Sequence, residues 1–130
     1  MHIKVTWDDH HDDIILFEFP PVFNWDQYYV AEDQAHAMIE ERGRDVGYIF
    51  DFPQNAKIPD NAISNGRRVI EQRHSKVTLV VNVGSTAFIR TLFNMGIRMY
   101  PTLRDNVAMS GTIDEAREMI CERLQQNVLR

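Results

Sequence analysis

Two nearly continuous apolar runs, separated by a stretch with helical periodicity, constrain the fold of this chain more than any other feature. They occupy residues 46–52 and 76–83 and are rich in β-branched and aromatic residues. Such runs are typical of strands that are covered on both faces, as in the centre of a parallel sheet. Parallel neighbours need a crossover connection, which a helix normally supplies. The sequence therefore predicts strands that alternate with helices.

The flanking segments extend this alternation in both directions. Ile3, Val5 and Trp7 alternate with polar residues, and a second apolar run at 14–19 follows the acidic segment 8–13, which predicts an antiparallel hairpin with an exposed loop. Helices are expected at about 24–42, 59–74, 85–96 and 112–124, with a last strand near 106–110. The predicted order is ββαβαβαβα: one α/β domain, residues 1–130, with four helices and a five-stranded, mostly parallel mixed sheet.

Capping signals mark several of the expected helix ends. Residues 24–27 and 112–115 each place a polar residue three positions before Gln or Glu, as in a reciprocal capping box. Gly43 suits the left-handed conformation that ends many helices. Ser85 or Thr86 is expected to cap the third helix at its start.

Composition excludes several classes of function. The net charge of −5 argues against nonspecific binding to nucleic acid, which requires basic clusters. No apolar run approaches the roughly 20 residues needed to cross a bilayer, and the first residues lack the apolar region of a signal peptide. Cys121 is the single cysteine, so no internal disulfide can form, and a buried, inert thiol is expected. These features predict a cytoplasmic protein without membrane insertion.

The element order, the strand leading through Asp51 to a loop and helix, and the ending at residues 112–116 resemble the STAS domain, the fold of bacterial anti-sigma-factor antagonists. The resemblance covers residues 3 to about 124. It implies a STAS-like fold and a regulatory, protein-interaction role rather than an enzyme.

The STAS family carries a phosphorylated serine in an Asp-Ser-Ser-Gly-Leu motif, and the corresponding segment here departs from it. Asp60 falls on the phosphorylated position, and Asn61, Ala62 and Ile63 fall on the next three. No hydroxyl is available there to accept a phosphate, and Asp60 supplies only part of the charge of a phosphate. The resemblance thus implies a contact surface rather than a phosphorylation cycle. The residues expected to bind a protein partner are Ile58, Asp60, Asn61, Ser64, Asn65, Arg67 and Arg68.

Other candidate sites carry weaker signals. The acidic, histidine-containing segment 8–13 could bind a metal ion, but adjacent side chains point in different directions, so a solvent-exposed hairpin tip is favoured. His36 and His74 have no sequence neighbour that would orient them as a base, and Ser85 lacks the pattern of a nucleophile elbow. Its turn could bind an anion at a helix start. No catalytic residue, metal site or cofactor is therefore predicted.

The alternative function is the binding or sensing of a small apolar or anionic molecule. One group of residues could pack in the core or form an exposed patch around the end of the third helix, which is expected to close at Gly96: Phe93, Met95, Ile97, Met99 and Tyr100. Trp25, Tyr28 and Tyr29 form a second candidate patch. A homodimer through the edge strand or the first helix is also plausible.

Overall fold

The computed structural model describes residues 2–84, 87–101 and 103–128. The elements run in the order β1 (Lys4–Trp7), β2 (Ile14–Glu18), α1 (Trp25–Arg42), β3 (Val46–Asp51), α2 (Ala62–Glu71), β4 (Val77–Val83), α3 (Ala87–Met99), α4 (Leu103–Asn106), β5 (Val107–Ser110) and α5 (Ile113–Val128).

The strands form one five-stranded sheet in the spatial order β1-β2-β3-β4-β5. β1 pairs with β2 in antiparallel fashion, and the other neighbours are parallel. The predicted α/β fold with a mixed, mostly parallel sheet is confirmed. The prediction of four helices is wrong by one, because the described residues also form the short helix α4. Its turn begins where the backbone N–H of Leu103 donates to the carbonyl of Tyr100.

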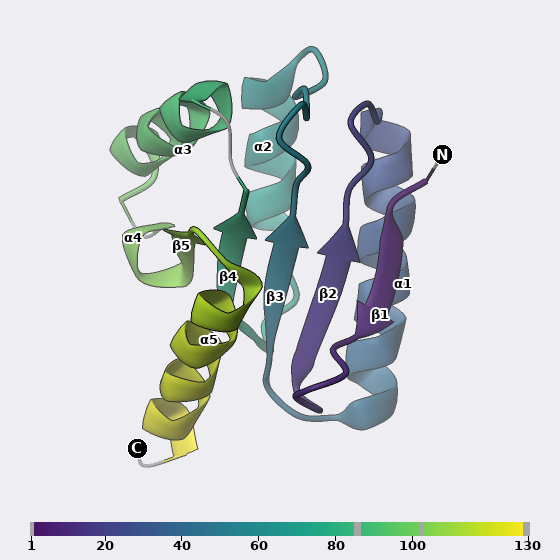
Figure 1. Cartoon of the computed structure of the whole chain (residues 1–130), viewed down its shortest axis with the longest axis vertical. Coiled ribbons are helices and arrows are strands. Elements are labelled where there is room, and N and C mark those ends of the chain that lie inside the picture. Colours follow the sequence, from purple (N-terminus) through teal and green to yellow (C-terminus); the bar gives the residue numbers. More distant parts are fainter. Residues whose placement is uncertain (1, 85–86, 102, 129–130) are drawn as a thin grey trace.

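The helices cover the two faces of the sheet unequally. In Figure 1, α1 and α2 lie behind the sheet, α5 crosses its front, and α3 and α4 lie beside β4 and β5. The larger core lies under α1 and is rich in aromatic side chains, among them Phe17, Phe19, Tyr48 and Phe50. The smaller core lies under α5, where Ile120 packs against β3 and β4.

The close approach of α5 to the sheet depends on a glycine in the middle of β3. A Cβ atom added at Gly47 would collide with the side chain of Ile120, whose Cδ1 would lie 2.9 Å away. Real Cβ atoms are not found at such distances from other carbon atoms. Gly47 therefore sets how deeply Ile120 reaches between the strands, which explains a glycine inside a buried strand.

Several predicted helix ends are confirmed. Asn24 and Gln27 form the reciprocal capping box at the start of α1, and Gly43 ends that helix with φ 73°. The Thr112 hydroxyl accepts from the backbone N–H of Glu115 at 3.1 Å. Ser85 and Thr86, the expected caps of α3, lie outside the described residues.

Two predicted helix boundaries are wrong. α3 continues through Gly96 to Met99, and the Gly96 carbonyl accepts from the backbone N–H of Tyr100 at 2.8 Å. A glycine is tolerated inside a helix when its hydrogen bonds persist, at a modest energetic cost. α2 begins at Ala62 rather than near Pro59, because Asn61 has the left-handed conformation, with φ 63°. No helix among the described residues is long and apolar enough to span a membrane.

Candidate functional site

An apolar cleft opens between α2 and α3 on the face of the sheet that α1 also covers. Its volume is about 250 Å³. The α2 side contributes Ile63 and Ile70, and the α3 side contributes Phe93 and Met99. The other lining residues are Ala62, Gly66 and Arg67 of α2, Met95 and Gly96 of α3, Trp25 of α1, Leu103 of α4, Asn82 of β4, Val107 of β5 and the loop residues Phe52, Ile58 and Tyr100.

Several side chains of the cleft remain open to solvent. Ile63 is 55% exposed, Met99 54% and Met95 40%. No residue of α2 is buried, although its apolar residues recur on one side of the helix. Large apolar side chains that gather on a surface mark a binding site more often than scattered ones do. The cleft therefore leaves apolar surface that a bound molecule would remove from water.

The cleft brings together apolar residues that lie far apart in the sequence. Trp25 of α1, Ile58 of the loop and Phe93, Met99 and Tyr100 at the end of α3 all line it. Tyr28, by contrast, is buried in the core under α1. The Trp25 indole N–H donates to the Asp60 carbonyl at 2.7 Å, and this hydrogen bond ties α1 to the loop that precedes α2.

The residues predicted to bind a protein partner divide between the cleft and its outer rim. Ile58 and Arg67 line the cleft. Asp60, Asn61 and Ser64 are exposed, and the Ser64 hydroxyl donates to the Asn61 carbonyl at 3.2 Å. Arg67 pairs with Glu71 one turn along α2, with 2.9 Å between Nε and Oε1.

Two more of these residues contact α1 instead of standing free. The Asn65 side-chain oxygen accepts from the Tyr29 hydroxyl at 2.8 Å. The Arg68 guanidinium carbon lies 4.0 Å from the centre of the Tyr29 ring, a cation–π contact. Tyr29 thus holds α2 against α1. The role of this surface in binding a partner stays a prediction.

A second cavity, of about 290 Å³, adjoins the apolar cleft. The two have Ile70, Leu103 and Val107 in common. The remaining lining of the second cavity is more polar: Arg73, His74, Ser75, Val77, Val80 and Asn106. The space along α2 therefore changes from apolar near its start to polar and cationic near its end.

A buried polar cluster lies beneath this polar end, between α1 and β3. Tyr28, Glu32 and Tyr48 are each less than 5% exposed. The hydroxyls of Tyr28 and Tyr48 and one oxygen of Glu32 have no hydrogen-bond partner of good geometry among the described residues. Burial raises the pKa of both tyrosines; the charge of Arg73 opposes this effect, and the nearby Glu32 adds to it. Both hydroxyls therefore stay protonated and can act as donors.

Both central histidines have carboxylate partners that their sequence neighbourhoods did not reveal. His74 Nε2 lies 2.6 Å from Glu40 Oε1, and His36 Nε2 lies 3.5 Å from Glu32 Oε1. The two imidazole rings are 5.5 Å apart, centre to centre. Glu32 is buried although it is acidic, because Tyr28, Glu32 and His36 follow one another at four-residue spacing on the same side of α1.

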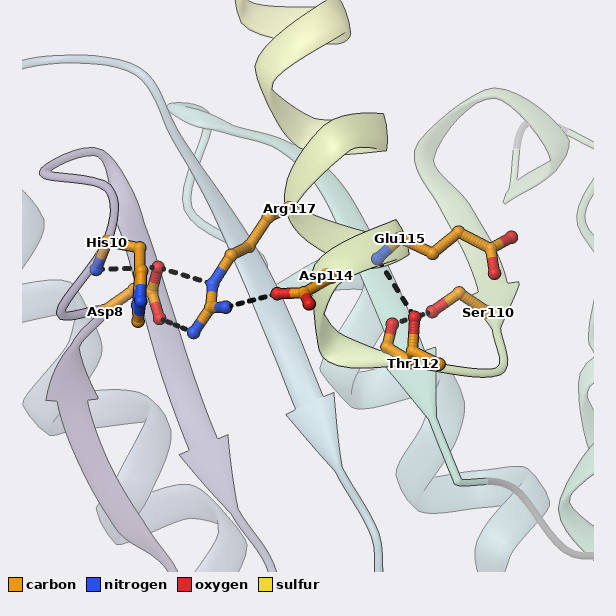
Figure 2. Close-up of polar contacts among 7 residues, drawn as sticks. All are labelled: Asp8, His10, Ser110, Thr112, Asp114, Glu115 and Arg117. Atoms are coloured by element: carbon orange, nitrogen blue, oxygen red, sulfur yellow. Dashed lines mark hydrogen bonds and ion pairs between the residues drawn. The ribbon is translucent and has the colours of Figure 1, made fainter.

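The acidic hairpin tip holds a third polar arrangement, on the opposite face of the sheet. Figure 2 shows Arg117 of α5 pointing toward Asp8, whose two carboxylate oxygens accept from Nε and Nη2, each at 2.9 Å. The same guanidinium donates to Asp114 at 2.7 Å. The predicted fully exposed loop is wrong at Asp8, which is buried. The hydrogen bonds to Asp8 raise the pKa of Arg117.

The rest of the hairpin tip does not form a metal site in the described part of the chain. Asp13 pairs with Arg44 at 2.9 Å, and His11 accepts from the Asp13 backbone N–H at 3.1 Å. No three His, Cys, Asp or Glu side chains among the described residues are placed to hold a metal ion. Cys121 of α5 is half-buried, and burial, with a smaller contribution from Asp8, raises the pKa of its thiol. A raised pKa leaves less of the nucleophilic thiolate.

Comparison with known proteins adds no assignment. No protein-family model matches the sequence, and no curated protein does. The site must therefore be interpreted from its own geometry.

Proposed function

We propose that this chain is a non-enzymatic binding module whose ligand is an apolar molecule held in the cleft between α2 and α3. The apolar lining of the 250 Å³ cleft carries the proposal, together with the exposure of Ile63 and Met99 at its mouth. Burial of apolar surface is favourable by about 25 cal/mol per Å². Ligand sites are typically concave and mostly apolar, with few polar groups that fix orientation.

The polar groups in the cleft are few, which favours binding over catalysis. Arg67 is the charged side chain of the lining, and it already pairs with Glu71. Asn82 of β4 is the uncharged amide residue of the lining. A single amide can orient a ligand, whereas general acid–base chemistry needs a titratable group within reach of the reacting atoms.

Ligand binding would also complete the packing of α2. The helix has no buried residue, so its apolar side stays partly in contact with water. A ligand that covers Ile63 and Ile70 would bury this side and stabilise the helix. A ligand that binds only the folded protein raises the free energy of unfolding, and this gain grows with the logarithm of the ligand concentration.

The proposal is tested with decanol, a neutral apolar probe, and with two matched variants. Trp25 lines the cleft, so its fluorescence should change on binding. Ile63→Gln should weaken decanol binding about tenfold or more, through loss of apolar contact in the cleft. Val30→Gln is the control, because Val30 is also exposed on a helix but lies on α1 outside the cleft. Absence of decanol binding to the wild type, or equal weakening by both variants, would refute the cleft as the site.

A protein-interaction role like that of STAS domains is the second candidate. The exposure of Asp60, Asn61 and Ser64 beside the cleft favours it, since a partner could reach these side chains without unfolding the loop. Capture from native lysate should then depend on residue 60 when wild type is compared with Asp60→Ser. Identical captured proteins for both forms would reject this surface.

A further inference from the structure

The cleft adjoins a cavity of different chemistry. Ile70, Leu103 and Val107 line both spaces, so the two lie next to each other along α2. At the far end the lining includes Arg73 and Ser75. An apolar space next to a cationic one matches an amphiphile better than a purely apolar ligand.

Arg73 is the residue that distinguishes this end. Its guanidinium carbon lies 5.6 Å from the Tyr48 ring centre and 5.9 Å from that of Phe50. Its Nε is buried without a hydrogen-bond partner, and no ion pair involves its guanidinium among the described residues. A cation withdrawn from water is costly unless an anion balances it.

The acidic residues of α1 in this region lie against histidines, although one oxygen of Glu32 stays buried without a hydrogen-bond partner among the described residues. Glu40 contacts His74, and Glu32 contacts His36. Neither forms an ion pair with Arg73 within the described part of the chain. The guanidinium therefore remains available to a ligand, and its planar fork matches a carboxylate in geometry.

We infer that the ligand is a single-chain amphiphile with a carboxylate head group, such as a fatty acid. Its chain lies in the apolar cleft, and its carboxylate lies at Arg73, where no protein carboxylate forms an ion pair within the described residues. This inference rests on the proposed function, because the apolar chain occupies the same cleft. It adds the chemical class of the ligand and its direction along α2.

The test compares decanoate with decanol, which have the same chain length and differ in head-group charge. Isothermal titration should show that the wild type binds decanoate about tenfold or more tightly than decanol at low salt, and that added salt reduces this preference. Arg73→Gln should remove the preference for decanoate, and Arg73→Lys should keep part of it. Arg104→Gln is the control, because Arg104 is exposed on α4 and lines neither space.

The outcomes separate this inference from the proposed function. Equal wild-type affinity for decanoate and decanol would overturn the inference and leave the apolar cleft standing. Binding of neither probe would overturn both. The wild-type comparison needs no variant, so it decides the question even if Arg73→Gln does not fold.

Discussion

Asp8 and Arg117 form a two-point ion pair between the N-terminal hairpin and the C-terminal helix. They are 109 positions apart in the sequence, yet Nε donates to Oδ2 and Nη2 to Oδ1, each at 2.9 Å. The Asp8 side chain is 1% exposed, whereas that of Arg117 is 21% exposed. The pair therefore holds α5 to the β1–β2 turn. Because Asp8 is buried, solvent screens the attraction between the two charges only in part.

Asp8→Asn should lower the free energy of unfolding by about 2–3 kcal/mol, because loss of the buried carboxylate leaves the half-buried Arg117 with only the exposed Asp114 as counter-charge. Urea denaturation followed by circular dichroism measures the change. Asp114→Asn is the matched control, since Asp114 binds the same guanidinium but its side chain is 89% exposed. That variant should change stability by no more than about 0.5 kcal/mol. A larger loss for Asp114→Asn than for Asp8→Asn would contradict this description of the pair.

Gly47→Ala should destabilise the protein by about 1–3 kcal/mol, because the added methyl group would overlap Ile120 and push α5 away from the sheet. The double-mutant cycle with Ile120→Ala isolates this contact. In the Ile120→Ala background the overlapping atoms are gone, so Gly47→Ala should cost clearly less than in the wild type. An equal cost in both backgrounds would show that Gly47 is required for another reason.

Gly66→Ala should stabilise the protein by about 0.5–1 kcal/mol. An added Cβ has no neighbour within 4 Å, and alanine favours the helical backbone of α2. Gly84→Ala should have the opposite effect, because Gly84 has φ +75° and its Cβ would collide with the Phe52 carbonyl. Thermal unfolding of the two variants should therefore move in opposite directions from the wild type. Destabilisation by Gly66→Ala would mean that α2 approaches its neighbours more closely than the structure shows.

Asp51→Asn should raise stability at neutral pH and have little effect in acid. Burial, followed by the charge of Glu18 on the paired strand, raises the pKa of Asp51. A carboxyl whose pKa is raised by folding favours its protonated form, so at pH values above its unfolded pKa the charge opposes folding. The amide side chain of the variant carries no charge and removes this cost. At pH values below the folded and unfolded pKa of Asp51, the wild type is also neutral at this position, so the two proteins should not differ.

Urea denaturation of wild type and Asp51→Asn between pH 3 and 8 measures this dependence. Asp9→Asn is the control, because Asp9 is exposed at the hairpin tip. A benefit of Asp51→Asn that persisted unchanged at low pH would point to a cause other than charge.

The elements of the fold were largely predictable because each leaves a local signal. The apolar runs around Tyr48 and Val81 identified the two central strands, and the capping box at Asn24 located the start of α1 within one residue. The end of α3 was missed because Gly96 resembles a C-cap in the sequence, although its hydrogen bonds show that the helix continues.

The sites were less predictable because they depend on contacts between distant segments. Ile58 and Phe93 were each singled out as possible binding residues, but nothing local showed that they line one cleft. Glu32 lies among acidic neighbours that suggest a solvent-facing position, yet it is buried. The four-residue spacing of Tyr28, Glu32 and His36 was the signal that could have revealed its burial. The partner of Asp8 lay too far along the chain for any pattern to identify it.

The sequential order of the strands has a consequence for how the chain folds. Because each strand pairs with the strand that precedes it in the sequence, every newly synthesised strand meets a partner that is already present. Pairing between consecutive strands limits each connection to one hairpin loop or one helical crossover, and shorter connections cost less entropy to close. α5 is the last element, and the Asp8–Arg117 pair becomes possible only when this helix has docked. During synthesis, α5 therefore follows all five strands, and its docking stabilises a sheet to which strands were added one by one in sequence order.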